Sequence, residues 1–465
     1  MRARHRCAGR GGLAKINKDK ADMKTFPLAH APGPAPRIRL GNAHPIARVA
    51  ALTGALVLGL CGVGRAGAQT TTSTASAPPT AALVSGTTAA DEGTDWKFTT
   101  RLSAIAEYDD NVFIQPANAR SDYSLHLTPS LAFGRGNFRS EFAPLTSVPY
   151  FLVRTDEEDL PQKNFAYVGY TPEAVLYDKY TAQDTVNHDA RIAARQEDDL
   201  TDLHGQLRFQ KMTDTDIDVG RRLRQIYYTA EAGGEAALSG KIAAGGDLIG
   251  RRTEYSGGFS STEGRVEGHL DYQAAPKTNV GLGAAVGRLD VSDGANQTYV
   301  QPLLEMKYQP TERISLSGQA GEEFRQFGGA RSDRSQFVFA ADGRYRPTES
   351  TVFTVSGRRD TQSSAQYVGE NIVGTTGQGS IRQRFFLRNY LTLTGGLVHN
   401  NYEENETGPA ISRRDNYQFY KIALSREVTR YGTVELSYDF HQNDSTISQF
   451  GFTQNIVGVA ASFFY

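Results

Sequence analysis

The sequence predicts an all-β fold, a transmembrane antiparallel up-and-down β-barrel of about 18 strands, with 16 as the alternative count. Three observations predict it. Apolar and polar side chains alternate over segments of about ten or more residues, the length at which a tilted strand crosses a bilayer. Short Pro/polar turns recur at a nearly constant spacing and alternate with longer loops. The chain also ends on an alternating strand whose last residue is aromatic.

The first 68 residues have the character of a signal peptide with an extended N-region. Basic residues precede the apolar run 49–60, which is too short to span a bilayer, and Ala66-Gly67-Ala68 offers a small-residue cleavage site. Residues 69–95 are rich in Thr, Ser, Ala and Pro, and we expect them to form a flexible periplasmic linker. The barrel is therefore assigned to residues 96–465.

Composition argues against several classes of function. Both cysteines, Cys7 and Cys61, lie in the leader, so the exported chain would hold no disulfide, thiolate nucleophile or cysteine metal site. The leader carries 12 Lys/Arg and 2 Asp/Glu, which leaves 38 basic (50 − 12) and 49 acidic (51 − 2) residues, a charge near −11. That charge disfavours nucleic acid as a partner. No other segment is apolar and long enough for a membrane helix, so a closed barrel is the remaining way to span a membrane.

Three related turns set the spacing of the strands. Tyr272, Tyr308 and Tyr345 each precede a Pro-containing turn, and they lie 36 and 37 residues apart. In barrels of outer membranes the short turns are periplasmic and the long loops are extracellular. The three tyrosines fall at strand ends on the apolar face, which suits an aromatic girdle. Weaker turns are expected at 234–240, 388–389 and 429–432, and longer loops at 290–296, 328–333, 361–371, 403–413 and 443–448.

Alternation assigns the faces of the strands. In the segment 433–441, Leu436 and Tyr438 share a face opposite Glu435 and Asp439. An apolar face turned outward is favoured over a soluble sandwich, because sandwich strands are typically about five to six residues long. The residues expected to line the lumen carry both signs: Arg208, Arg265, Glu267, Glu305, Lys307, Glu323, Arg325, Asp342, Arg344, Arg382, Arg384, Glu435 and Asp439. The alternative is that they form cross-strand ion pairs that stabilise the wall, and both can hold.

The strand count follows from parity. If the linker and the C-terminus both lie in the periplasm, the number of strands is even. The pattern gives 18 strands if 136–163 is an insertion and not an ordinary spanning strand. This segment contains Pro144, Pro149 and the acidic run 156–159, which suit an insertion.

The last strand is expected to carry the signal that the barrel-assembly machinery reads. Its apolar side chains fall on one face, which we expect to contact lipid, with Tyr465 at the periplasmic boundary. This strand should pair with the segment 101–108, because that pairing removes both edges of the sheet. Taken alone, the segment is also compatible with the closing strand of a soluble sheet. The residues of the expected signal are Val457, Val459, Ala461, Phe463 and Tyr465.

No group of residues indicates catalysis, a cofactor or a metal. The histidines lie mostly on polar faces, where hydrogen bonding is the simplest role, and none has His-x-x-x-His spacing. Asn187-His188-Asp189 has no serine that the sequence singles out as a partner. Asp109-Asp110-Asn111 could bind a cation, but capping of a loop is favoured. The expectation is a protein that is not an enzyme. The six histidines beyond the leader are His126, His188, His204, His269, His399 and His441.

Two motifs and the chain end resemble a known group. Tyr108-Asp-Asp-Asn-Val-Phe113, Leu127-Thr-Pro-Ser-Leu131 and the terminal region from Tyr438 onward resemble the second β-barrel porin family of bacterial outer membranes, over roughly 96–465. Genes of that family often accompany exopolysaccharide clusters. The resemblance therefore implies a pore for polymer passage, with polysaccharide and periplasmic export proteins as partners.

The expected function is a pore in the bacterial outer membrane, surrounded by lipid, for hydrophilic solutes or for exopolysaccharide export. A mixed-sign lining suits neutral or zwitterionic solutes better than one selected ion. Two alternatives remain. One is a structural or adhesive barrel with a filled lumen, and the other, less favoured, is an outer-membrane hydrolase.

Overall fold

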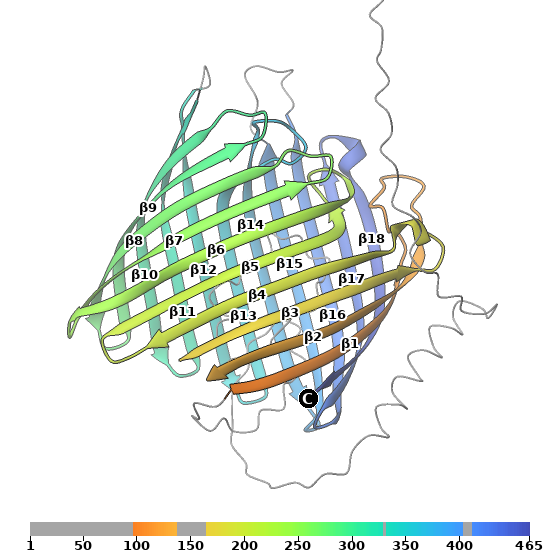
Figure 1. Ribbon diagram of the computed structural model, residues 1–465, viewed down its shortest axis with the longest axis horizontal. Helices are drawn as coiled ribbons and strands as arrows, with labels where there is room; N and C mark the ends of the chain where they lie inside the picture. The colour runs from red at the N-terminus through yellow and green to blue at the C-terminus, as the bar shows by residue number, and fades with distance from the viewer. Residues whose placement is uncertain (1–95, 137–163, 329–331, 403–411) are drawn as a thin grey trace, which may run out of the picture. The chain divides into compact units, whose positions relative to one another are not determined.

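The computed structural model describes residues 96–136, 164–328, 332–402 and 412–465, which form one closed antiparallel β-barrel of 18 strands (Figure 1). The expected fold is confirmed, and so is the higher of the two strand counts. The leader, the linker 69–95 and residues 137–163 lie outside the described residues. The strands are β1 (Trp96–Asp109), β2 (Asp122–Gly136), β3 (Phe165–Tyr177), β4 (Thr185–Glu197), β5 (Thr201–Asp216), β6 (Arg221–Ser239), β7 (Ile242–Tyr255), β8 (Ser261–Ala275), β9 (Thr278–Val291), β10 (Gln297–Thr311), β11 (Ile314–Phe327), β12 (Arg334–Thr348), β13 (Thr351–Ser363), β14 (Asn371–Phe385), β15 (Asn389–Tyr402), β16 (Arg414–Thr429), β17 (Gly432–Ser445) and β18 (Phe452–Phe464).

Each strand pairs with its neighbours in the chain, and β1 closes the barrel by pairing with β18. The register runs from Arg101 opposite Phe464 to Asp109 opposite Ile456, so the pairing expected for the segment 101–108 is confirmed. Closure removes both sheet edges, which would otherwise expose unpaired backbone groups to hydrocarbon. Within the described residues, the short 3₁₀ helices η2 (Thr181–Gln183) and η3 (Ser448–Phe450) lie in the loops.

The described helices do not reach the length and apolarity that a membrane-crossing helix needs.

A buried polar contact marks the seam between β1 and β18. Ser103 and Ser462 are directly opposite, and their hydroxyl oxygens are 2.7 Å apart. Arg101 donates from Nε to Ser103 Oγ at 3.1 Å, and its guanidinium lies 5.4 Å from the centre of the Phe464 ring. The chain ends therefore meet through side chains as well as through backbone hydrogen bonds.

Because of this contact, we expect that a disulfide can be engineered between β1 and β18. With Cys7 and Cys61 replaced by serine, the pair Ser103→Cys and Ser462→Cys should oxidise readily, because opposite residues of antiparallel strands have a Cα separation that a disulfide fits. Non-reducing electrophoresis should show a mobility shift that reductant reverses. As a control, Leu102→Cys with Ser462→Cys should not cross-link, because adjacent residues of a strand point to opposite faces. Equal cross-linking of both pairs would contradict the closed register.

The outer face of the barrel is apolar. Exposed apolar residues alternate with buried polar ones along the strands: on β17, Leu436 is 52% and Tyr438 40% exposed, whereas His441 is buried. Aromatic side chains gather where strands meet the short turns. Tyr272, Tyr308 and Tyr345 are all exposed at such ends, as the sequence predicted. Trp96 and Phe133 stack at the same end, with ring centres 4.9 Å apart.

Contacts across the barrel identify the other face as the inner one. Ile217, in the β5–β6 loop, belongs to one buried apolar cluster with Val398 on β15 and with Tyr417 and Phe419 on β16. The strands β17, β18 and β1–β4 lie between β16 and β5 in the sheet, so these residues can meet only across the interior. Leu397 and Tyr420, which alternate with the contacting residues, are exposed on the outside.

Most of the expected turns are found, with two differences. The turn expected at 234–240 is displaced to residues 240–241, because β6 continues to Ser239. Gly233 and Gly234 serve close packing within the sheet: a Cβ on Gly234 would lie 2.6 Å from Leu203 Cδ2. The second difference concerns the insertion expected over 136–163, because Gly136 is the last residue of β2. β2 pairs directly with β3, and the rest of the expected insertion, residues 137–163, lies outside the described residues, so the insertion stays a prediction.

Candidate functional site: the loop-covered mouth of the barrel

The loops that follow the odd-numbered strands lie at one end of the barrel. There the β5–β6 loop (217–220) reaches across the opening. Its side chains contact the β13–β14 loop (364–370), β16 and the residues around η3. Gly220 allows the turn, because its φ of +70° suits glycine and a Cβ there would lie 2.7 Å from the Phe450 ring. The packed β5–β6 loop therefore narrows the mouth of the barrel.

Asp218 ties the loop to the β13–β14 loop. Its carboxylate accepts hydrogen bonds from the Ser364 hydroxyl at 3.0 Å and from the backbone N–H groups of Ala365 and Gln366 at 2.6 and 3.1 Å. Val219 and Ala365 pack together with Leu223 in a small apolar cluster beside this contact. Three donors on one carboxylate hold the loop in one position.

Arg413 holds the same loop from the opposite wall. The residue is fully buried and donates to the backbone carbonyls of Asp218 and Ile217 at 2.6 and 2.8 Å. Its guanidinium also forms a two-pronged ion pair with the buried Asp415 and lies 3.5 Å from the centre of the Phe450 ring. Planar guanidinium suits this combination of carboxylate, carbonyl and aromatic contacts. We call Asp218, Arg413, Asp415 and Phe450 the mouth clasp.

Burial and hydrogen bonding shift the pKa values of Asp218 and Arg413 in opposite directions. Burial raises the pKa of the Asp218 carboxyl above its ordinary value, although Arg413 and the donors of the β13–β14 loop counteract this. Burial would lower the pKa of the Arg413 guanidinium, but its hydrogen bonds to Asp415 outweigh that effect, and the pKa is raised. Arg413 is therefore a permanent cation, and the ionisation of Asp218 is coupled to the packing of the loop.

A second loop lines the mouth from the β1 side. Ile114, which has a φ of +46°, is buried in the same apolar cluster as Ile217 and Phe452. Asn111 is 1% exposed and donates to the backbone carbonyls of Gln115 and Thr453, both at 2.9 Å. Asp109-Asp110-Asn111 thus caps this loop, as the sequence favoured, because Asp109 also accepts from the Asn111 N–H at 2.7 Å.

The thirteen charged residues expected to line the lumen all alternate with apolar residues of the outer face, so they lie on inner-face positions. Among them, Arg265 pairs with Glu267 at 2.5 Å, and Glu323 pairs with Arg325 at 2.8 Å. Others pair with residues outside the set, as Arg208 does with Asp189, Lys307 with Asp271, and Asp439 with Lys421. The remaining members of the set on this face are Glu305, Asp342, Arg344, Arg382, Arg384 and Glu435.

One of these pairs stabilises the wall. Glu323 is 1% exposed and accepts from Arg325, from Gln301 at 2.6 Å and from Thr361 at 2.9 Å. Such a satisfied network rigidifies the strands it joins. The stabilising role considered from the sequence therefore applies here, and a role in contacting solutes stays a prediction for the set as a whole.

The residues of the expected assembly signal lie on one side of β18. Val457, Val459 and Tyr465 are exposed, Phe463 is partly exposed and Ala461 is 3% exposed. Ala461 is covered because its side chain is short and its partners Ala104 and Val434 flank it. Their recognition by the assembly machinery stays a prediction.

The histidines divide between the two faces. His126, His204, His269 and His441 lie on the inner face, whereas His188 and His399 lie on the outer face. The two outer histidines each contact one neighbour, the Tyr170 hydroxyl at 2.8 Å and Asn416 Oδ1 at 2.7 Å. The alternation of apolar and polar residues alone did not show that these two histidines face outward.

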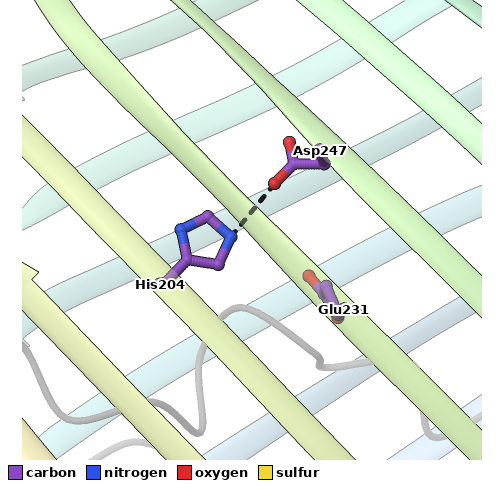
Figure 2. Close-up of side chains that lie close together, drawn as sticks. All are labelled: His204, Glu231 and Asp247. Atoms are coloured by element: carbon purple, nitrogen blue, oxygen red, sulfur yellow. Dashed lines mark ion pairs between the residues drawn. The ribbon is translucent and has the colours of Figure 1, made fainter.

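Three inner histidines have carboxylate neighbours that the sequence did not reveal: His126 lies beside Glu107 and Glu173, and His204 and His269 each belong to a group of three ligand-type side chains. His204, Glu231 and Asp247 come from β5, β6 and β7, and Figure 2 shows the His204 ring facing the Asp247 carboxylate, with Glu231 beside them. Glu235, His269 and Asp271 form a similar group nearby. A search for ligand spacing along one strand misses both groups, because the register of several strands assembles them.

An apolar exterior with aromatic ends, a charged interior and complete closure together define the class of membrane protein. The chain is a bacterial outer-membrane β-barrel.

No protein-family model and no curated protein matches the chain. Among solved structures, OccAB4 of Acinetobacter baumannii is 10% identical, with a TM-score of 0.40, over 79% of this chain and 98% of that one. OccK2 (OpdF) of Pseudomonas aeruginosa is 12% identical, with a TM-score of 0.41, over 80% of this chain and 98% of that one. The outer membrane protein OpdK of Pseudomonas aeruginosa is 12% identical, with a TM-score of 0.37, over 79% of this chain and 99% of that one. These similarities carry no argument about the solute or activity of this barrel.

Proposed function

We propose that this barrel is a passive pore for hydrophilic solutes, narrowed at its mouth by the β5–β6 loop. The observation that carries the proposal is the placement of ionisable side chains of both signs on the inner face of a closed 18-stranded wall. Barrels of about 16 to 18 strands are wide enough for an aqueous channel. A mixed-sign lining favours neutral or zwitterionic solutes, because neither sign dominates the field.

Exopolysaccharide export is the narrower hypothesis, and its support is the resemblance carried by 108–113, 127–131 and the terminal region. The packed loop narrows the mouth, so a polymer wider than the remaining opening would pass only if the β5–β6 loop left the contacts that Asp218 makes with Ser364 and Ala365. A small solute needs a smaller opening and therefore less movement of the β5–β6 loop.

Single-channel recording in planar bilayers tests the pore. We expect discrete conductance steps from the full barrel, and larger steps from Asp218→Ala, because this change removes the acceptor that holds the loop to the β13–β14 loop. Swelling of proteoliposomes in sugars of increasing length then separates small-solute passage from polymer passage. If the full barrel, Asp218→Ala and a variant without 137–163 are all silent, the pore is excluded and a structural barrel with a filled lumen is favoured.

A further inference from the structure

His204 and Asp247 meet across a strand that lies between them. In the register, His204 on β5 is opposite Gly233 on β6, and Gly233 is opposite Asp247 on β7. Side chains two strands apart reach each other only if the middle residue is small, since neighbouring strands are about 4.8 Å apart. Gly233 meets this condition, because a Cβ there would lie less than 2.5 Å from Asp247 Oδ1.

The atoms that converge over Gly233 are metal-ligand atoms. His204 Nε2 lies 3.0 Å from Asp247 Oδ1, and Glu231 brings a carboxylate oxygen so that all three ligand atoms lie within 4.8 Å of one another (Figure 2). Gln206 orients Glu231 by donating from Nε2 to its Oε2 at 2.8 Å. This hydrogen bond leaves Glu231 Oε1 for a further partner.

The contact between His204 and Asp247 is an ion pair whose geometry is poor for a hydrogen bond. Asp247 Oδ1 is shielded from solvent and, within the described part of the chain, has no hydrogen-bond partner of acceptable geometry, despite the short distance to His204. Buried polar atoms are normally paired, so a shielded carboxylate oxygen that faces an imidazole nitrogen without a well-formed hydrogen bond is an atom that a bound cation would satisfy. The side chains of both residues are 24% exposed, which leaves access from the lumen.

The same arrangement recurs one step along the inner face. Glu235 on β6 is opposite Gly245 on β7, which is opposite His269 on β8. His269 Nε2 lies 3.6 Å from Glu235 Oε2 and is also a shielded atom without a hydrogen-bond partner in the described residues. Asp271 completes this group, but Lys307 lies 3.4 Å from its carboxylate and supplies part of the positive charge. The first group is therefore the stronger candidate.

We propose that His204, Glu231 and Asp247 bind one first-row divalent transition metal, such as Zn²⁺, on the wall of the lumen. One imidazole nitrogen and two carboxylates suit Zn²⁺ better than Ca²⁺ or Mg²⁺, which prefer oxygen ligands alone. Two carboxylates also neutralise the charge of the ion. Tetrahedral Zn²⁺ needs ligand atoms about 3.4 Å apart, so small side-chain rotations close the site and leave the fourth position to water or a solute.

Metal binding to the full barrel in detergent, first stripped with a chelator, tests the proposal. We expect equilibrium dialysis to give one tightly bound Zn²⁺ per chain, and Co²⁺ to give the visible absorption of a nitrogen-containing, four-coordinate site. Asp247→Asn and His204→Gln should each weaken Zn²⁺ binding by about tenfold or more, since each removes one ligand. Binding is measured without conductance, so its result is separate from that of the pore proposal.

Control substitutions outside the proposed site test whether a loss of Zn²⁺ binding is specific to its three ligands. Asp342→Asn removes another inner-face carboxylate and His399→Gln removes an outer-face imidazole, and neither should change Zn²⁺ binding. Gly233→Ala keeps all three ligands but should lose the metal, because its methyl group occupies the place of Asp247 Oδ1. If a ligand variant fails to fold by circular dichroism, the Co²⁺ spectrum of the unmodified barrel decides. Absence of tight Zn²⁺ binding, equal affinity for Ca²⁺, or unchanged binding in the folded ligand variants would overturn the proposal and leave an ion pair only.

Discussion

Arg413→Ala is expected to loosen the mouth of the barrel more than any other single substitution there. The change leaves Asp415 buried without its ion-pair partner and frees the carbonyls of Ile217 and Asp218. Removing one partner of a buried ion pair costs about 3–5 kcal/mol. We expect the backbone amides of the β5–β6 loop to exchange hydrogen faster than in the unmodified barrel. We also expect a conductance that fluctuates between more levels.

The neighbouring residue provides the control. Arg414 is exposed at the start of β16, so Arg414→Ala should change neither measurement by much. Arg413→Lys should be intermediate, since a lysine keeps the charge but cannot make the two-pronged contact with Asp415. If Arg413→Ala and Arg414→Ala behave alike, the mouth clasp does not hold the loop.

Leu304→Arg is expected to impair insertion of the barrel into lipid. Leu304 lies midway along β10, is 65% exposed and faces outward beside Leu282 on β9. An arginine on the lipid face near the bilayer midplane costs about 2–4 kcal/mol. Urea titration in lipid vesicles should show this loss, with the single tryptophan, Trp96, reporting the transition from its exposed position at the end of β1.

The same substitution in a turn is the matched control. Leu387 is 90% exposed in the turn between β14 and β15, beyond the ends of both strands. Because the cost falls to about 0–1 kcal/mol near the membrane interface, Leu387→Arg should leave the titration nearly unchanged. Equal losses at both positions would mean that the outer face of β10 does not contact lipid.

Much of the barrel was predictable because its determinants are local. A two-residue period sets which side chains of a strand share a face, and this assigned Leu436 and Tyr438 to the outside correctly. Pro-containing turns located the boundaries near Tyr272, Tyr308 and Tyr345. Where local signals conflicted, the expectation failed: a turn was expected over 234–240, but β6 continues to Ser239, and Gly234 makes room for Leu203 of the neighbouring strand.

The mouth clasp was not predictable from the residues that form it. Asp218 and Arg413 are 195 positions apart and carry no motif, and Arg413 was included only as the end of an expected loop. Their contact depends on how far a short loop reaches across a closed barrel. The group over Gly233 was missed for a related reason, because its ligands come from three strands whose register no pattern within one strand defines.

By itself, the sequence determined the strands, their faces, the even count and the pairing of the chain's last strand with the first described one. These follow from side-chain alternation, turn chemistry and the requirement that no backbone group be left unpaired in hydrocarbon. Only the tertiary structure decided what the inner face assembles: the loop held across the mouth and the imidazole–carboxylate groups on the wall. The physical reason is that both arise from contacts across the barrel or across several strands, where position depends on closure and register and not on neighbours in the chain.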